Sequence, residues 1–171
     1  IDQIIHGTTL ATNALIERRG AKTALITTKG FRDVIEMRTE SRFEQYDLNL
    51  NLPDPLLPRQ MRFTVAGRVD ANGNVLVDID RAEVEAVVDQ IAKGGFESVA
   101  VGLIHSYLNP AHEQLVRDVL AERLPDVAVS ISSEVSPQMR EYERFNTVVA
   151  NAYIKPLMAS YLGRLEDRLK D

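Results

Sequence analysis

The stretch SVAVGLI, residues 98–104, is nearly continuously apolar. A run of this kind is typical of a strand that is covered on both faces, as the strands of parallel sheets are. The apolar part, Val99–Ile104, is also far too short to span a bilayer. We therefore expect a strand here that is buried on both of its faces.

Helix signals flank this strand on both sides. Asp80 followed by Glu83 has the form of a capping box, and Gly94-Gly95 ends the helix that they open. After the strand, Asn109-Pro110 places a capping residue before a proline that suits the first helical position. A further strand is expected at 127–131. This alternation of strands and helices predicts an α/β fold.

A β-hairpin is expected at the start of this α/β unit, which we place at residues 62–132. Residues 62–70 (RFTVAGRVD) alternate in the manner of a strand, Asn72-Gly73 is a strong hairpin signal, and the chain returns at 75–77. Residues 38–61 lack apolar periodicity and contain three prolines. They predict a long ordered loop, and loops of this length are more often functional than idle.

The first unit, residues 1–37, has the pattern of a strand, a helix and a second strand. We expect a strand to end at residues 3–5, a helix to start at Leu10, and Gly20 to stop that helix in a left-handed conformation. Residues 22–28 then form the second strand. A helix between two strands favours a right-handed parallel crossover.

The last segment, residues 136–171, is expected to be helical, with one apolar stripe along it. Pro156 lies in its middle and should kink or break it, because proline removes a backbone donor. The stripe continues beyond Pro156 and needs a partner surface. The predicted fold is a parallel or mixed sheet with crossover helices and a long, kinked C-terminal helix.

Composition excludes several classes of function. The 171 residues include 20 Lys+Arg and 25 Asp+Glu, and the resulting net charge of −5 argues against nucleic-acid and anionic-membrane partners. The chain has no cysteine, so it can form no disulfide, zinc-thiolate site or cysteine nucleophile. No secretion signal is present, and we expect a cytoplasmic protein. Both ends look cut from a larger chain.

The best candidate site is the turn His6-Gly7-Thr8-Thr9. Motifs for phosphate loops, dinucleotide binding, zinc proteases and serine hydrolases are absent from the sequence. The turn leads into a helix through two hydroxyl residues, which with free backbone N–H groups suit a phosphate or carboxylate. The alternative is a threonine cap with a glycine that permits a tight turn. Asn13, one turn further on, either points to the same place or lies on a solvated face.

Two other groups of polar residues are weaker candidates. His105, His112 and Glu113 would have to converge to bind a metal, yet their spacing matches no known ligand pattern, and we expect no metal site. Glu141 and Glu143 point about 200° apart on a helix, so they cannot form an acid/base pair on one face. A solvated face with i,i+3 ion pairs is expected instead.

Several long blocks, in order, resemble the N-terminal region of the hydantoinase A/5-oxoprolinase family. They are HGTTLATNALIERRGAKTALITTKGFRDVIEMR, YDL, PLLPR, VGLIHSYLNPAHE and SSEVSPQMREYERFNTVVANAYIKP. The resemblance runs from Ile4 to about Leu162, which is nearly the whole chain.

The resemblance implies a fragment of an actin-like (ribonuclease H-like) ATPase architecture. Family members use ATP with Mg to open the ring of a cyclic amide such as 5-oxoproline or a hydantoin, and related members carboxylate ketones. Phosphorylating the carbonyl oxygen of the ring would create a leaving group and an activated carbon. The implied partners are the remainder of the same polypeptide and a second, hydantoinase B-type subunit or domain.

The resemblance also assigns roles and shows a departure. It places Gly7, Thr8 and Thr9 at the nucleotide or substrate cleft, with His6 as an orienting or proton-handling catalytic group, while Arg38, Arg140 and Asn13 are further candidates for ligand binding. The family's main Gly-Thr-rich phosphate motifs are absent from this chain. We therefore expect no turnover from this piece alone.

Two alternatives stay open. The chain could belong to an ATP-dependent ketone carboxylase of the acetone carboxylase type. It could also be a non-catalytic assembly module that uses its amphipathic final helix.

Overall fold

A four-stranded parallel sheet forms the centre of the molecule in the computed structural model, which describes residues 7–39, 44 and 46–170. Its strand order is β2-β1-β5-β6, and every pair of neighbours is parallel. The strands are β1 (Thr23–Thr28), β2 (Arg62–Val65), β5 (Ser98–Gly102) and β6 (Ala128–Ile131). The strand expected at 98–104 is confirmed as β5, with all its residues buried.

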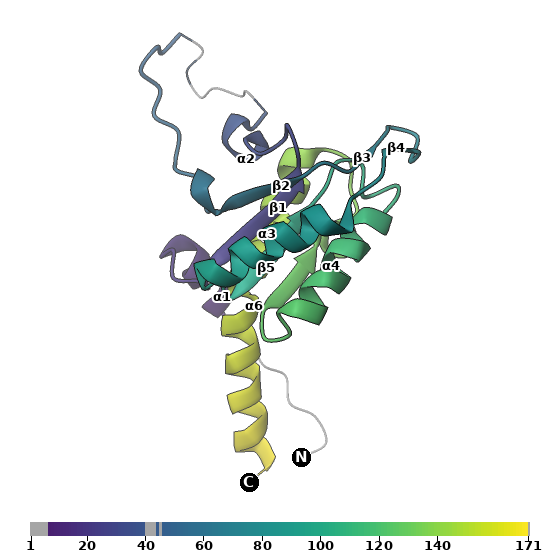
Figure 1. Ribbon diagram of the computed structural model, residues 1–171. Helices are drawn as coiled ribbons and strands as arrows, with labels where there is room; N and C mark the ends of the chain where they lie inside the picture. Colours follow the sequence, from purple (N-terminus) through teal and green to yellow (C-terminus); the bar gives the residue numbers. More distant parts are fainter. Residues whose placement is uncertain (1–6, 40–43, 45, 171) are drawn as a thin grey trace.

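Helices cover both faces of the sheet (Figure 1). One face packs against α3 (Arg81–Gly94) and α4 (Ala111–Arg123), and the other against the long α6 (Glu141–Lys170). The short elements are α1 (Leu10–Ile16), α2 (Val34–Met37), the 3-10 turn η1 (Arg59–Met61) and α5 (Ser132–Val135). The α/β class, the parallel sheet and the long C-terminal helix expected from the sequence are confirmed.

Two apolar clusters fill the space between these layers. Ala24 and Ile26 of β1 enter the cluster with α3 and α4, whereas Leu25 between them enters the cluster with α6. The same alternation holds in β5, where Ala100 faces α6. A strand's side chains point alternately to opposite faces, so an apolar run without alternation buries both of them.

The caps of α3 and α4 follow the sequence pattern with one difference. The Asp80 carboxylate accepts a hydrogen bond from the Ala82 N–H at 2.9 Å, and Gly95 ends α3 with a left-handed φ of 63°. Glu83 does not complete the capping box, because its carboxylate accepts from the Ala66 N–H at 2.8 Å. Glu83 therefore ties α3 to the turn after β2 rather than to its own N-terminus.

The expected first strand of the hairpin, 62–70, is split in two. Arg62–Val65 joins the parallel sheet as β2, and only β3 (Arg68–Val69) pairs with β4 (Val75–Val77) in an antiparallel hairpin. The turn at Gly73 is confirmed, with φ 85°. The break falls at Ala66-Gly67, where a Cβ on Gly67 would lie 2.9 Å from the Ile79 Cβ.

Gly20 has a different role from the expected one. The left-handed residue after α1 is Arg18 (φ 54°), and Gly20 is needed for close packing instead. A Cβ at Gly20 would lie 2.2 Å from the Tyr153 ring, and the neighbouring Ala21 N–H donates to the Tyr153 carbonyl at 2.9 Å. The strand end expected at 3–5 lies outside the described residues.

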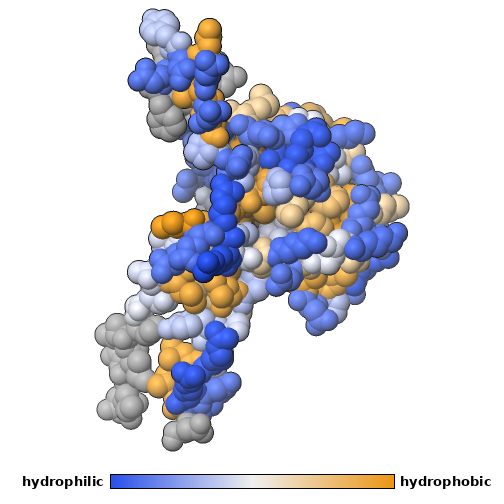
Figure 2. Space-filling model, turned by 90° about the vertical axis from the view of Figure 1, so that its left-hand side faces the viewer, coloured by the Kyte–Doolittle hydropathy of each residue, from blue (hydrophilic) through white to orange (hydrophobic). Residues whose placement is uncertain are grey.

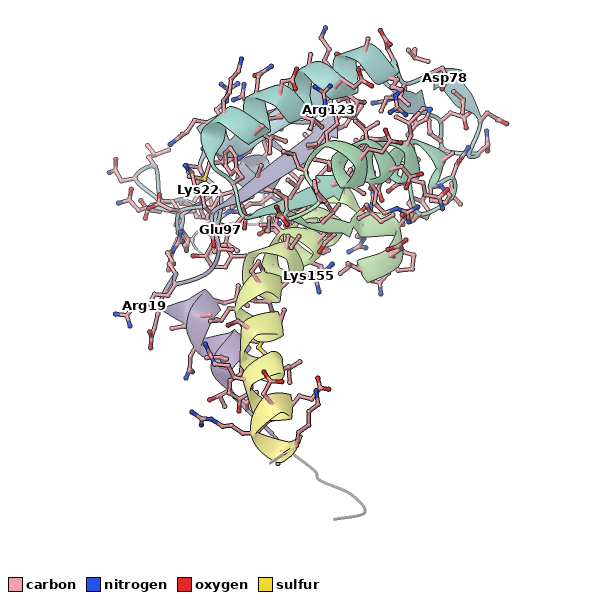
Figure 3. All side chains as sticks on the ribbon, turned by 60° about the horizontal axis from the view of Figure 1, so that its bottom comes forward. Arg19, Lys22, Asp78, Glu97, Arg123 and Lys155 are labelled. Carbon is pink, nitrogen blue, oxygen red and sulfur yellow. The ribbon has the colours of Figure 1, made fainter. Side chains whose placement is uncertain are left out.

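Lys22 and Glu97 connect the amino ends of β1 and β5. Figure 3 labels both residues, each directly before its strand. The Lys22 N–H donates to the Glu97 carboxylate at 3.2 Å, and the Glu97 N–H donates to the Lys22 carbonyl at 2.9 Å. The Lys22 ammonium also donates to the Gly94 carbonyl at 2.6 Å. The two chain segments that enter the sheet are thus held together before the strands begin.

Helix α6 continues through Pro156 and is not broken there. Its first half packs on the sheet through buried side chains that include Phe145 and Tyr153, while its second half extends away from the sheet (Figure 1). Figure 2 shows apolar surface on this extending part, where Leu162 and Leu169 are each 52% exposed. Among the described residues, none of the helices is long and apolar enough to cross a membrane.

Candidate functional site

The described part of the HGTT turn, Gly7 to Thr9, lies at the surface, directly before α1. His6 lies outside the described residues, and Gly7, Thr8 and Thr9 are exposed. The Thr8 hydroxyl oxygen accepts from the Leu10 N–H at 3.1 Å, so Thr8 caps one backbone donor of the helix. The Thr9 hydroxyl oxygen accepts from the Asn13 amide at 3.5 Å, which places Asn13 beside the turn.

Arg38 and Arg140 are brought together in a second place. They line a pocket of about 460 Å³ between α2 and the first turn of α6. Sequence reasoning gave both residues as candidates without predicting that they meet. The rest of the lining is mainly apolar on the α2 side and acidic on the α6 side, with Phe31, Val34, Met37 and Glu143 among its residues.

Both arginines have an unusual backbone conformation. Arg38 has a φ of 60° and Arg140 a φ of 81°, values that non-glycine residues rarely adopt. Such conformations tend to cluster at sites where the chain must place a side chain in one direction. The Arg38 guanidinium donates to the Pro53 carbonyl, and the Arg140 guanidinium lies 3.8 Å from the Glu143 carboxylate. The latter contact is the i,i+3 ion pair expected for this helix face.

The pocket lies where ligands collect in parallel α/β sheets. The chain leaves β1 toward β2 and leaves β5 toward β6, so the strand order changes direction between the adjacent strands β1 and β5. Crevices beyond the carboxyl ends of strands at such a switch point are the usual ligand sites of this fold type. Phe31 and α2 follow the carboxyl end of β1 directly, which puts the pocket at this edge of the sheet.

The HGTT turn does not share this pocket. The connection after α1 contacts α6 at Tyr153, whereas the pocket uses residues 140–143 of the same helix. Tyr153 lies twelve positions beyond Glu141, which is about 18 Å along the helix at a rise of about 1.5 Å per residue. Figure 1 accordingly shows α1 and α2 toward opposite ends of the sheet. The two groups of candidate residues therefore form separate locations in this part of the protein.

Among the described residues, His105 and His112 do not come together with Glu113 as metal ligands. The His112 ring nitrogen lies 3.2 Å from the carboxylate of Asp78, the residue labelled beside the hairpin in Figure 3. Glu113 is buried elsewhere, and within the described ranges no three His, Cys, Asp or Glu side chains come together as metal ligands. His105 has a φ of 56° and a buried Nδ1 without a hydrogen-bond partner.

Glu113 instead belongs to a buried polar network that sequence reasoning missed. Its carboxylate accepts from the Leu103 N–H at 2.8 Å, the Ser132 hydroxyl at 2.7 Å and the Ser133 N–H at 2.8 Å. These donors follow the carboxyl ends of β5 and β6. The Glu113 side chain therefore joins α4 to the turn that follows β5 and to the short helix α5 that follows β6.

Arg144 completes this network from α6. It is fully buried, and its guanidinium donates to the Ser132 hydroxyl at 3.2 Å, the Gln138 carbonyl at 2.8 Å and the Leu103 carbonyl at 2.8 Å. Burial lowers the pKa of Arg144, and the nearby Glu113 charge opposes that shift. Nothing local separates Arg144 from the solvated Arg140 in the sequence REYER, because their burial depends on which side of α6 meets the sheet.

A model of the hydantoinase/oxoprolinase N-terminal region matches residues 1–124 of the chain. The chain belongs to this family. The resemblance seen in the sequence blocks is confirmed, and the matched residues include the sheet strands β1, β2 and β5 and the helices α3 and α4.

The relatives include proteins of different stated activities. The chain is 37% identical over 167 residues to the caprolactamase subunit alpha of Pseudomonas jessenii, covering 96% of this chain and 24% of the relative. It is 31% identical to the acetophenone carboxylase gamma subunit of Aromatoleum aromaticum (99% and 25% covered) and 31% identical to the 5-oxoprolinase of Saccharomyces cerevisiae (93% and 14%).

The structural comparison agrees with these relatives. The crystal structure of the ATP-dependent caprolactamase of P. jessenii superimposes with a TM-score of 0.91 at 36% identity, and covers 99% of this chain and 25% of that chain. The architecture is thus of the actin-like ATPase type that the resemblance implied. The chain spans about a quarter or less of the length of these relatives.

Proposed function

We propose that this chain is part of an ATP-dependent enzyme that hydrolyses a cyclic amide. The observation that carries the proposal is the likeness to the ATP-dependent caprolactamase, which extends over 99% of the chain at a TM-score of 0.91. The 5-oxoprolinase relative is named for a second cyclic amide. The shared chemistry is an amide bond inside a ring.

The need for ATP follows from the chemistry of the ring. An unstrained lactam is a poor electrophile, and its opening requires a coupled source of free energy that ATP supplies when bound. Among the candidate residues that the structure describes, Thr8 and Thr9 have exposed hydroxyls that can donate to a phosphate. The described residues contain no cluster of ligands for Mg. This donor set does not make a complete Mg-ATP site, so its other ligands belong to the rest of the enzyme.

The HGTT turn is the part of this chain that we propose to face the nucleotide or substrate. Replacing Thr8 and Thr9 together by alanine in the intact enzyme should lower substrate-dependent ATP cleavage on the order of 10²-fold, because two hydroxyl donors are lost. Thr12→Ala, an exposed threonine on α1, is the matched control. Unchanged turnover in the double variant would remove the turn from the site.

A ketone carboxylase is the second candidate, and the acetophenone carboxylase relative favours it. Incubation of the intact enzyme with ATP separates the two functions. A cyclic amide should stimulate ATP cleavage and yield the ring-opened amino acid, whereas a ketone with bicarbonate should do neither. ATP cleavage that depends on ketone and bicarbonate would reverse this assignment.

The partners proposed here are the remainder of the polypeptide and a second subunit, in a cytoplasmic complex. Caprolactamase subunit alpha and acetophenone carboxylase gamma subunit are both named as subunits, which supports an assembly. The exposed leucines on the second half of α6 are suited to such contacts. Size measurement of the purified complex would test this arrangement.

A further inference from the structure

We propose that the pocket between α2 and the first turn of α6 binds the cyclic amide itself. In this arrangement, the ring lies on the apolar wall and the amide group lies between Arg140 and Glu143. The inference rests on the proposed function and adds the place and the contacts of the substrate.

The size and lining of the pocket fit a small ring compound. Its volume of about 460 Å³ is within the usual range of small-molecule sites, about 300–1,000 Å³. Phe31, Val34 and Met37 give it an apolar wall. The methylene groups of a ring would move out of water when they pack against this wall. Each buried CH₂ contributes roughly 0.8 kcal/mol to the binding free energy.

The polar side of the pocket offers a donor beside an acceptor. The Arg140 guanidinium and the Glu143 carboxylate lie 3.8 Å apart, with side chains 76% and 46% exposed. Surface pairs of this kind contribute little stability, so a ligand can separate them at small cost. Arg38 places a second guanidinium in the lining, where it donates a hydrogen bond to the Pro53 carbonyl.

The amide of a small ring matches this donor and acceptor. A ring of five to seven atoms holds its amide in the cis form, so the C=O and N–H lie on the same edge of the ring. Arg140 can donate to the carbonyl oxygen while Glu143 accepts from the N–H. A ketone has no N–H and would leave the Glu143 carboxylate without a donor. The pair would thus select a lactam over a ketone.

The first test narrows the pocket in the intact enzyme. Met37→Trp fills the pocket from an exposed position, and Leu76→Trp on the hairpin is the matched control, because each native side chain is 63% exposed. With ε-caprolactam, 2-pyrrolidone and hydantoin as probes, Met37→Trp should raise the KM at least tenfold and weaken binding measured by calorimetry without ATP. Leu76→Trp should change neither. An unchanged KM in Met37→Trp would overturn the inference.

The second test concerns the N–H contact. The wild-type enzyme should prefer 2-pyrrolidone over N-methyl-2-pyrrolidone by about tenfold or more, since a hydrogen bond to a charged group is lost. Glu143→Ala should reduce this preference at least tenfold, whereas Glu166→Ala, on the far part of α6, should keep it. A preference that survives in Glu143→Ala contradicts the contact. Failure of all cyclic amides to stimulate ATP cleavage by the wild type would instead refute the proposed function.

Discussion

Replacing Glu113 by alanine tests whether the buried network holds the ends of β5 and β6 in place. Glu113 is fully buried, and it is an acceptor for the Leu103 N–H, the Ser132 hydroxyl and the Ser133 N–H. The alanine variant leaves the Leu103 and Ser133 N–H groups without this partner, while the Ser132 hydroxyl keeps its contact with the Ser106 hydroxyl at 3.1 Å. It also removes the negative charge of Glu113, which is the nearby charge that most opposes the lowering of the Arg144 pKa by burial.

The size of the effect follows from the donors that lose their partner. The Leu103 N–H is buried and the Ser133 N–H is half-buried, and each buried donor left unsatisfied costs about 1–3 kcal/mol. The two together predict a loss of about 2–6 kcal/mol. The buried Arg144 also loses the favourable influence of the Glu113 charge, which acts in the same direction. We expect a loss near 4 kcal/mol, against a total of about 5–15 kcal/mol for a typical domain.

Urea unfolding of the 171-residue chain, followed by circular dichroism, measures this loss. With a slope of about 2 kcal/mol per molar urea, the midpoint should fall by about 2 M. Glu122→Ala on the same helix is the control, because that carboxylate is 57% exposed and its surface pairing with Arg81 contributes little stability. If Glu113→Ala lowers the free energy of unfolding by less than about 1 kcal/mol, the reasoning is refuted. Such a small loss would mean that water enters and accepts from the buried donors in place of the carboxylate.

Two further predictions concern packing and pH. Gly20→Ala should destabilise the chain by about 1–3 kcal/mol, because the added Cβ would overlap the Tyr153 ring. Gly163→Ala has open space around the added Cβ and should stabilise α6 by about 0.5–1 kcal/mol. Thermal unfolding of both variants should give shifts of opposite sign, and equal shifts would contradict the packing argument. The hydrogen bond from Arg59 holds the pKa of Asp33 below its usual range. Asp33 therefore contributes stability above its unfolded pKa of about 3.9, and this contribution is lost as the pH falls through the lower folded value. The stability difference between wild type and Asp33→Asn should shrink between pH 6 and pH 3 in urea titrations, and a difference independent of pH would rule out this linkage.

Elements that depend on local patterns could be predicted from the sequence. The buried strand at 98–104, the Asp80 cap and the left-handed Gly95 all follow from residue types over a few positions. The alternation in 62–70 could not show where one strand stops and the next begins. That break is set by Gly67 packing against Ile79, which lies twelve residues further along the chain.

Side-chain partners and burial were the least predictable features. The Glu83 carboxylate accepts a hydrogen bond from the Ala66 N–H rather than from the N-terminus of its own helix. Arg144 is buried, whereas Arg140, four positions earlier, is exposed. In each case, the outcome depends on a neighbouring layer that the local sequence does not encode. The meeting of Arg38 and Arg140 has the same origin, since α2 and α6 are separated by about a hundred residues.

The strand order has a practical consequence at the margins of the sheet. β2 and β6 are each hydrogen-bonded to one neighbour among the described strands, so each has a row of backbone amides and carbonyls on its outer side. Such rows can accept an additional strand from another molecule. Preparations of residues 7–170 are therefore best kept dilute, because self-association through these two outer strands would increase with concentration.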